Sequence, residues 1–399
     1  MSAEQTAPTQ KKISVLAATV IGVNAMIGAG IFAMPTELSA TVGPASILSY
    51  LLSSLLILSI VFPLSRLAQL HPGEGWGYRY PALWGGHNLG MLSSLGYVSG
   101  VIVAMGFLAQ QGGVQLGQWL PYAPAHIGAV MLLLIVALVL AGTEISSWGQ
   151  YVIAVCVLVP MALASLMCLK HFDPALATPF APYGWSSVAT VMPTIMFTLF
   201  GFESIASLYS VVEDPQRNVP RAAVFSVLIV VGMYTLFVAS ALLSIAPAFF
   251  AKGMDQSIAD VMVTVWPQYG YMRIITTIGA FFGIFGTLHS MVWSVAMLFR
   301  DTITRSRSSM VATLERSNWL SGRNCVLIVG GLTLLFALTL QARIILKLTA
   351  VCILPAYILS LVALLFERKE WAGGRNMLTL VAVAASSALL YIAAYNVVS

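Results

Sequence analysis

The sequence predicts an all-α polytopic membrane protein. Hydrophobic residues make up 59% of the 399 positions and charged residues only 8%, whereas soluble proteins carry roughly 25% charged residues. Long apolar runs recur along the whole chain, and each is close to the ~20 residues that a helix needs to cross a bilayer. Strands of a membrane barrel are about 10 residues long and alternate in polarity, so these runs predict helices.

About eleven transmembrane helices are expected from the apolar runs. Their predicted ranges are 13–40, 44–66, 89–118, 124–142, 148–169, 187–212, 221–246, 271–299, 324–341, 345–366 and 376–397. The polar connections between them are too short for a soluble domain. The chain 1–399 is therefore predicted to form a single transmembrane domain.

The distribution of basic residues predicts the orientation of these helices. With residues 1–12 as a cytoplasmic tail, fourteen lysines and arginines fall in inside loops and five outside. Short loops rich in lysine and arginine stay in the cytoplasm, which supports this orientation in the cell inner (plasma) membrane. An odd number of helices then places Ser399 outside the cytoplasm. The net charge of +5 is a topology signal, and no nucleic-acid partner is expected.

The first apolar run is interrupted in its middle by Gly28-Ala29-Gly30. Glycine has no Cβ, so the backbone can leave helical geometry there and a ligand can approach it closely. Inside a bilayer, unwound backbone occurs only where it lines a cavity or is buried in protein. Broken helices near the membrane midplane are typical of secondary transporters. The alternative interpretation is close helix packing through small residues.

The sixth apolar run carries a second glycine, Gly201, followed by a carboxylate at membrane depth, Glu203. Interrupted helices one and six predict a five-plus-five inverted repeat, with repeat one at 13–169, repeat two at 187–366 and an extra helix at 376–397. An intramembrane carboxylate costs roughly 3 kcal/mol on insertion scales and is a functional candidate by default. A second interpretation is that Glu203 caps the half-helix after the break. One residue can serve both roles.

Three motifs occur in the order and at the distances found in one group of transporters. They are Ile27–Phe32 (IGAGIF), similar to IG(S/A)G(I/V)F; Phe200–Ser204 (FGFES), similar to G-[VF]-E-S; and Glu213–Ala222 (EDPQRNVPRA), similar to E-x-x-N-P-x-R-N-x-P-R-A. In these motifs the chain resembles the amino acid–polyamine–organocation (APC) superfamily, and the resemblance covers spans one to ten. It implies a transporter fold with broken helices one and six.

The sequence also departs from the family pattern. Pro72–Tyr80 resembles the family loop P-x-A-G-G-x-Y-x-Y, but Glu74 and Trp76 replace its alanine and second glycine. Many members have twelve helices, so the last hairpin here is incomplete. The fifth span has no lysine, and some relatives use a lysine there in proton coupling. Its absence argues against that coupling route.

The resemblance implies a zwitterionic substrate held between the two breaks. Backbone N–H groups of Gly28, Ala29 and Gly30 would bind its carboxylate at the positive end of a half-helix. Carbonyls freed at the second break would accept hydrogen bonds from its ammonium. The expected substrate-binding residues are Met26, Ile27, Gly28, Ala29, Gly30, Ser99, Ala104, Phe197, Leu199 and Phe200.

Three residues are expected to act in gating or coupling. The resemblance places an aromatic gate at Phe197, and the alternative is a phenylalanine that faces lipid or the core. Glu203 is the second. His289 is the third, because an intramembrane histidine that titrates near neutral pH can relay protons or contact substrate. The alternative is a neutral histidine hydrogen-bonded within the bundle. Glu37 is interpreted as a charge at a helix end.

These features predict secondary active transport of amino acids by alternating access, through exchange or proton coupling. The alternative is a polyamine or basic amino acid antiporter, suggested by the FGFES motif, although the pocket segments offer few acidic groups for a second cation. A nutrient sensor without flux is a further alternative. An intramembrane enzyme would need a catalytic set at one depth, and the sequence shows none, so no enzymatic activity is expected.

No cofactor or metal is expected. The four cysteines have no CxxC spacing and are interpreted as buried free thiols. The expected partners are a small-molecule amino acid substrate and the lipid bilayer, with the protein as a monomer or homodimer.

Overall fold

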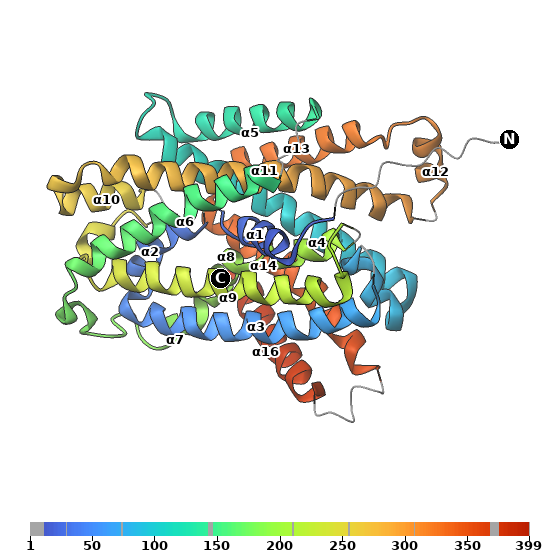
Figure 1. The fold of residues 1–399 in the computed structure, drawn as a ribbon, viewed down its shortest axis with the longest axis horizontal. Helices are drawn as coiled ribbons and strands as arrows, with labels where there is room; N and C mark the ends of the chain where they lie inside the picture. The colour runs from blue at the N-terminus through green and yellow to red at the C-terminus, as the bar shows by residue number, and fades with distance from the viewer. Residues whose placement is uncertain are drawn as a thin grey trace.

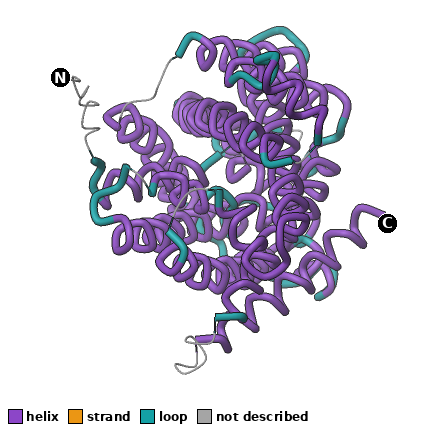
Figure 2. The backbone as a smooth tube through the Cα atoms, turned by 90° about the vertical axis from the view of Figure 1, so that its right-hand side faces the viewer, coloured by secondary structure: helices purple, strands orange, loops and turns teal. Residues whose placement is uncertain are grey.

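The computed structural model describes residues 12–28, 30–72, 75–142, 147–209, 211–253, 256–306, 308–367 and 375–398. Within them the chain is helical apart from its connections and one isolated bridge between Ile13 and Val212. Most of the long helices run in similar directions (Figure 1). In the view turned by 90°, the last helix projects from the edge of the bundle (Figure 2).

The helices follow one another in two halves. The first half contains α1 (Val15–Met26), α2 (Gly30–Thr41), η1 (Gly43–Ala45), α3 (Ser46–Leu70), α4 (Trp76–Gly117), α5 (Pro124–Leu140), α6 (Ser147–Lys170) and η2 (Pro174–Ala177). The second half contains α7 (Ser186–Thr190), α8 (Met192–Leu199), η3 (Phe202–Leu208), α9 (Pro215–Leu242), η4 (Pro247–Phe250), α10 (Ile258–Val265), η6 (Pro267–Tyr269), α11 (Met272–Thr304), α12 (Ser309–Arg316), α13 (Gly322–Thr339), α14 (Ala342–Leu365) and α16 (Arg375–Val398).

The predicted polytopic helical fold is confirmed. In the described part of the chain, nine helices are long and apolar enough to cross a membrane, and the bent pair α1–α2 raises the number to ten. The remaining predicted span is α5, an apolar helix of 17 residues, which is at the short end for a bilayer. The third span was predicted to begin at residue 89, but α4 begins at Trp76 and bends at Gly86, where φ is 71°.

The first apolar run is broken as predicted. Helix α1 ends at Met26, Ile27 has non-helical backbone angles, and α2 continues at 45° to α1. Side chains from other helices satisfy the carbonyl groups at the end of α1. The Thr287 hydroxyl donates to the carbonyls of Asn24 (3.0 Å) and Ile27 (3.2 Å), and the Tyr234 hydroxyl donates to that of Met26 (3.1 Å). The break is therefore supported by α11 and α9.

The sixth apolar run is also broken. Helix α8 ends at Leu199, Phe200 is extended, and Gly201 has a φ of 117°. The half-helix expected after the break is the 3-10 helix η3. A Cβ at Gly201 would lie 2.5 Å from the carbonyl oxygen of Ala25. The two broken segments thus touch through their backbones, and only glycine permits that approach.

The broken segments lie inside the bundle. Helix α1 packs against α9, η3, α6 and α11, and α14 packs against α4, α8 and α16. In Figure 1, α5 and α13 lie along one edge and α3 and α16 along the opposite edge. One end of the bundle carries α12, here named the α12 end, and the other carries α10, here named the α10 end (Figure 1).

Replacing Gly201 by alanine should destabilise the protein. A non-glycine residue at positive φ costs about 1–3 kcal/mol, and the added Cβ would collide with the Ala25 carbonyl. The melting temperature of the purified protein should fall. Gly232→Ala is the matched control, because nothing lies within 4 Å of a Cβ built at Gly232 in the middle of α9. Equal melting temperatures for the two variants would contradict the backbone contact.

Candidate functional site

A small cavity lies where the two broken segments meet. Its volume is about 40 Å³, close to the ~30 Å³ that one water molecule occupies in the liquid. Its walls come from α1, α2, α4, α8, the second break, α11 and α14. The lining residues are Ala25, Met26, Gly28, Gly30, Ile31, Val101, Ala104, Leu108, Phe197, Thr198, Phe200, Gly201, Glu203, Thr287, Met291, Thr349 and Ile353.

Most of the predicted binding residues gather at this cavity. Met26, Gly28, Gly30, Ala104, Phe197 and Phe200 line it. Ile27 and Leu199 are buried beside it without lining it. Ala29 lies outside the described residues.

Ser99 does not belong to the cavity wall. It is exposed, whereas Val101, Ala104 and Leu108 of the same helix line the cavity. Because an α-helix turns by about 100° per residue, a side chain two positions before Val101 points to nearly the opposite side. The expectation for Ser99 came from a loose alignment that did not follow the face of α4.

His289 is buried but does not line the cavity either. Its ring stacks on that of Phe285, with 6.0 Å between centroids. Thr287 and Met291 of the same helix face the cavity, and the 3.6-residue period turns His289 away from both. The structure therefore gives His289 no contact with the cavity.

Only some of the backbone N–H groups at the first break are available to bind a ligand. The Gly28 N–H already donates to the Met26 carbonyl at 3.0 Å. Gly30 begins α2, and the first four N–H groups of an α-helix have no partner within the helix. The start of α2 is therefore the part of this break whose backbone suits an anion.

The carbonyls at the second break have retained acceptor capacity. The Phe197 carbonyl accepts one long hydrogen bond of 3.4 Å from the Phe200 N–H. A carbonyl oxygen has two lone pairs, so this group can still accept from an ammonium. Phe197, Phe200 and Gly30 all line the cavity, so donors and acceptors of the two breaks border one space.

Glu203 accepts hydrogen bonds from two segments at the second break. One carboxylate oxygen accepts from the Gly201 N–H at 3.0 Å and the other accepts from the Tyr97 hydroxyl at 2.6 Å. Glu203 is buried, at 6% exposure, and also lines the cavity. The contact with Gly201 ties Glu203 to the backbone just before η3, and the capping interpretation stays a prediction. The same carboxylate links the second break to α4.

A group of aromatic rings packs beside the second break. Trp76 stacks on Tyr357 with 5.3 Å between centroids and meets Tyr97 edge-on at 4.8 Å. Tyr357 also packs against Phe200 and Phe202. We call Trp76, Tyr97, Phe202 and Tyr357 the inner aromatic cluster. Trp76 stands where the family loop has glycine, and its ring packs between Tyr97 of α4 and Tyr357 of α14.

Phe197 lines the cavity beside the start of α2. Its ring packs edge-on against Phe107 with 5.1 Å between centroids. A Cβ at Gly30 would lie 3.2 Å from the Phe197 ring, so this ring lies directly over the start of α2. Phe197 is buried within the protein, so it does not face lipid, whereas burial agrees with the core-facing alternative, and the gate role stays a prediction.

An ion pair joins α2 to α14 nearer the α10 end. The Arg343 guanidinium donates to both carboxylate oxygens of Glu37, at 3.1 and 3.0 Å. Glu37 is only 5% exposed and lies within α2, so it is more than a solvated charge at a helix end. This two-point contact fixes α2 against the start of α14.

Several residues at the site were not singled out from the sequence. Thr198, Thr287 and Thr349 give the cavity its hydroxyl groups, and Tyr50 forms a hydrogen bond of 2.8 Å with Thr198. Tyr97 and Tyr357 come from α4 and α14. Threonine and tyrosine are common in apolar spans, so no sequence pattern marked these residues.

Comparison with known proteins identifies the family. A family model described as amino acid permease matches residues 13–399. The chain belongs to the amino acid permease family. The expected resemblance to the APC superfamily is thereby confirmed. Family membership points to a multi-pass membrane transporter rather than an enzyme.

Three relatives show the range of this permease's similarities. It is 25% identical over 288 residues to the uncharacterized amino acid permease YecA of Bacillus subtilis (strain 168), covering 71% of the chain and 66% of YecA. It is 23% identical to the methylthioribose transporter of the same organism, covering 78% and 73%. It is 22% identical to the branched-chain amino acid permease BcaP of that organism, covering 88% and 80%. The match to YecA spans slightly less than two thirds of that protein.

Glu203→Gln should weaken the second break of the permease. Both carboxylate oxygens of Glu203 accept a hydrogen bond, whereas a glutamine side chain has only one acceptor oxygen. Loss of a charge-assisted hydrogen bond costs about 1.5–3 kcal/mol. The melting temperature should fall, and uptake into liposomes should change because an amide replaces the carboxylate that lines the cavity. Glu315→Gln, on an exposed position of α12, is the control. Unchanged uptake would leave Glu203 a purely structural role.

Trp76→Ala should open the inner aromatic cluster. The experiment uses a cysteine-free background with Met291→Cys as a reporter inside the cavity. A water-soluble thiol reagent added from the α12 end should label this cysteine faster when the Trp76 ring is removed. Trp148→Ala is the control, since Trp148 is 76% exposed. Unchanged labelling would show that another group forms the barrier.

Proposed function

We propose that this permease carries amino acids across the cell inner membrane by alternating access, with the substrate held at the junction of the two broken helices. The observation that carries the proposal is the single cavity wall shared by Gly28 and Gly30 of the first break and Phe200 and Gly201 of the second. Half-helix ends facing a midplane cavity are the usual substrate site of transporters with broken helices.

The two breaks offer complementary groups to a zwitterion. The N–H groups at the start of α2 suit a carboxylate, and the Phe197 and Phe200 carbonyls suit an ammonium. Neither interaction requires a charged side chain. The chemistry common to all amino acids would thus be bound by backbone, leaving the side chain to be selected by the remaining wall.

The remaining wall favours an apolar substrate side chain. Val101, Ala104, Leu108, Met291 and Ile353 line it. Glu203 is the one carboxylate among the described lining residues, and both of its oxygens already accept hydrogen bonds. A cationic side chain would compete with those bonds. We therefore favour small or medium apolar amino acids over basic amino acids and polyamines, which remain the alternative because Glu203 faces the cavity.

Substrate entry requires the cavity to open. A volume of about 40 Å³ holds little more than a water molecule, which is too small for an amino acid. The inner aromatic cluster closes one side, and Phe197, followed by the Glu37–Arg343 pair, closes the other. The proposed cycle separates these two barriers alternately, with substrate exchange or proton coupling setting the direction.

The proposal includes the orientation and the internal repeat. The basic loops favour a cytoplasmic position for the α12 end, so the inner aromatic cluster would face the cytoplasm and the Glu37–Arg343 pair the outside. The two broken spans would occupy matching positions in repeats 13–169 and 187–366. Each copy of the chain would hold its own substrate site, in a monomer or a homodimer.

Gly30→Ala should reduce uptake of the substrate by about tenfold or more, equivalent to ~1.4 kcal/mol of lost binding. The added Cβ would lie 3.2 Å from Phe197 and Thr198 and would cover the N–H groups at the start of α2. The measurement is uptake into liposomes for a panel of amino acids, with putrescine and lysine included.

Gly331→Ala is the matched control, because nothing lies within 4 Å of its Cβ on α13. Normal uptake by Gly30→Ala would contradict the proposed site. Uptake of putrescine or lysine, without uptake of apolar amino acids, would favour the antiporter alternative.

A further inference from the structure

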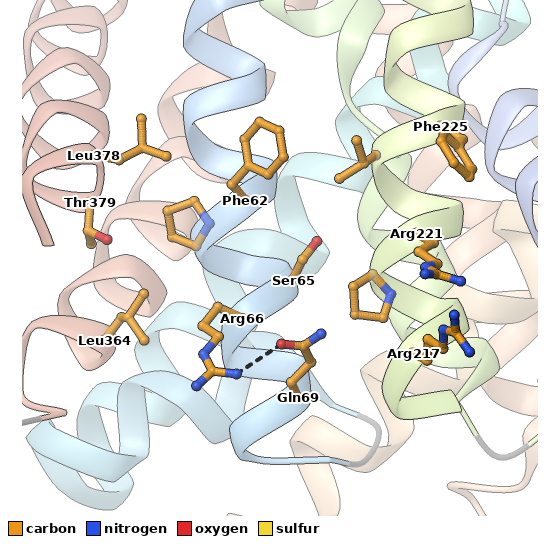
Figure 3. A pocket seen from close by; sticks show the side chains of 13 residues that line it. Phe62, Ser65, Arg66, Gln69, Arg217, Arg221, Phe225, Leu364, Leu378 and Thr379 are labelled. Carbon is orange, nitrogen blue, oxygen red and sulfur yellow. Dashed lines mark hydrogen bonds between the residues drawn. The ribbon is translucent and has the colours of Figure 1, made fainter. Parts of the chain in front are cut away.

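A groove separate from the central cavity opens between α3, α9, α14 and α16. It has a volume of about 770 Å³. Its described lining residues are Phe62, Pro63, Ser65, Arg66, Gln69, Arg217, Pro220, Arg221, Val224, Phe225, Leu364, Leu378 and Thr379. Figure 3 shows Arg66 and Gln69 on α3 standing opposite Arg217 and Arg221 on α9.

Three guanidinium groups concentrate positive charge at one level of the groove. Arg66 donates to the Gln69 side-chain oxygen at 3.1 Å, and Arg217 and Arg221 lie one helical turn apart on exposed positions of α9. No carboxylate occurs among the described residues that line the groove. A planar guanidinium matches phosphate oxygens in a two-point hydrogen bond, so this end suits a phosphate group.

The upper part of the groove is apolar. Phe62, Phe225 and Leu378 are 48%, 50% and 42% exposed, and Figure 3 shows them beyond the arginines along the helices. Eight residues separate Arg217 from Phe225, which corresponds to about 12 Å along the axis of α9. The groove therefore changes from basic to apolar along the direction in which the bundle crosses the membrane.

We propose that this groove binds an anionic phospholipid, with its phosphate between Arg66, Arg217 and Arg221 and its acyl chains along Phe62, Phe225 and Leu378. A basic pocket between membrane helices, at the level of the headgroups, is the kind of site that retains anionic lipids. The lipid would belong to the cytoplasmic leaflet, in line with the orientation proposed above.

The apolar wall distinguishes a lipid from a soluble phosphate compound. A free anion would use only the three arginines and would gain nothing from the exposed aromatic and leucine side chains. The groove also lies on the outside of the bundle, where α16 packs against α3 and α14. Bilayer lipid thus reaches it sideways, without passing through the protein.

A bound lipid would contact both sides of the central site. Helix α9 packs against α1 and η3, which carry the two breaks, and α14 contributes Thr349 and Ile353 to the cavity. A ligand that touches α9, α3 and α16 is placed to change how easily these helices separate. Lipid composition is thereby linked to the opening of the cavity.

The test is native mass spectrometry and thermal unfolding of the purified protein with short-chain phosphatidylglycerol, phosphatidylcholine or inorganic phosphate. Wild-type protein should retain phosphatidylglycerol and be stabilised by it more than by phosphatidylcholine. The affinity of the double variant Arg217→Gln/Arg221→Gln for phosphatidylglycerol should fall by roughly tenfold or more. Arg316→Gln/Arg323→Gln removes the same charge from exposed positions on α12 and α13 and should bind as wild type does.

Equal binding of the two phospholipids by the wild type would overturn the proposal, and this arm needs no variant. Equal losses in both double variants would also overturn it, because they would reflect net charge alone. Stabilisation by inorganic phosphate equal to that by phosphatidylglycerol would indicate a soluble anion and refute the lipid. If the groove variant does not fold, Ser65→Glu, which places a carboxylate beside Arg66, should weaken phosphatidylglycerol binding in its place.

Discussion

The backbone contact between the two broken helices is the constraint on which the rest of the site depends. Breaking a helix inside a bilayer exposes N–H and C=O groups that lipid cannot satisfy. Here Gly201 lies against the Ala25 carbonyl, and hydroxyls of Thr287 and Tyr234 satisfy the carbonyls at the end of α1. Glu203 satisfies the Gly201 N–H from the other side. Each break is therefore stabilised by neighbouring helices, and the groups left over face the cavity.

Closure of the cavity follows from the same arrangement. The second break directs Phe197 to one side, over Gly30, and Phe200 and Phe202 to the other, against Tyr357. Both barriers thus include residues of one broken segment. In the proposed cycle, a shift of this segment would have to open one barrier while the other stays closed.

The groove on the outer surface differs from the central cavity in charge. The central cavity is lined mainly by apolar groups and backbone, whereas the groove between α3, α9 and α16 has three arginines at one end. Arg217 and Arg221 belong to the same EDPQRNVPRA segment that supports the family assignment. In the structure this segment leads into α9 and its two arginines are exposed beside the groove, a placement that the motif alone did not show.

Sequence alone determined the class of the protein, the approximate spans and the two breaks, because membrane helices need long apolar runs and glycine interruptions stand out within them. It also located Met26, Gly28, Gly30, Ala104, Phe197 and Phe200, which line the cavity. These positions follow from local patterns and family motifs, which can be recognised without knowing how the helices pack against one another.

Only the tertiary structure decided which side chains contact one another and which face the cavity. Ser99 and His289 lie on membrane helices as expected, but the rotation of α4 and α11 turns them away from the cavity. Glu37 finds Arg343 306 residues further along the chain, and Glu203 finds Tyr97 on α4. Helix rotation and long-range pairing depend on how whole helices pack together, and a single sequence carries no local signal for that packing.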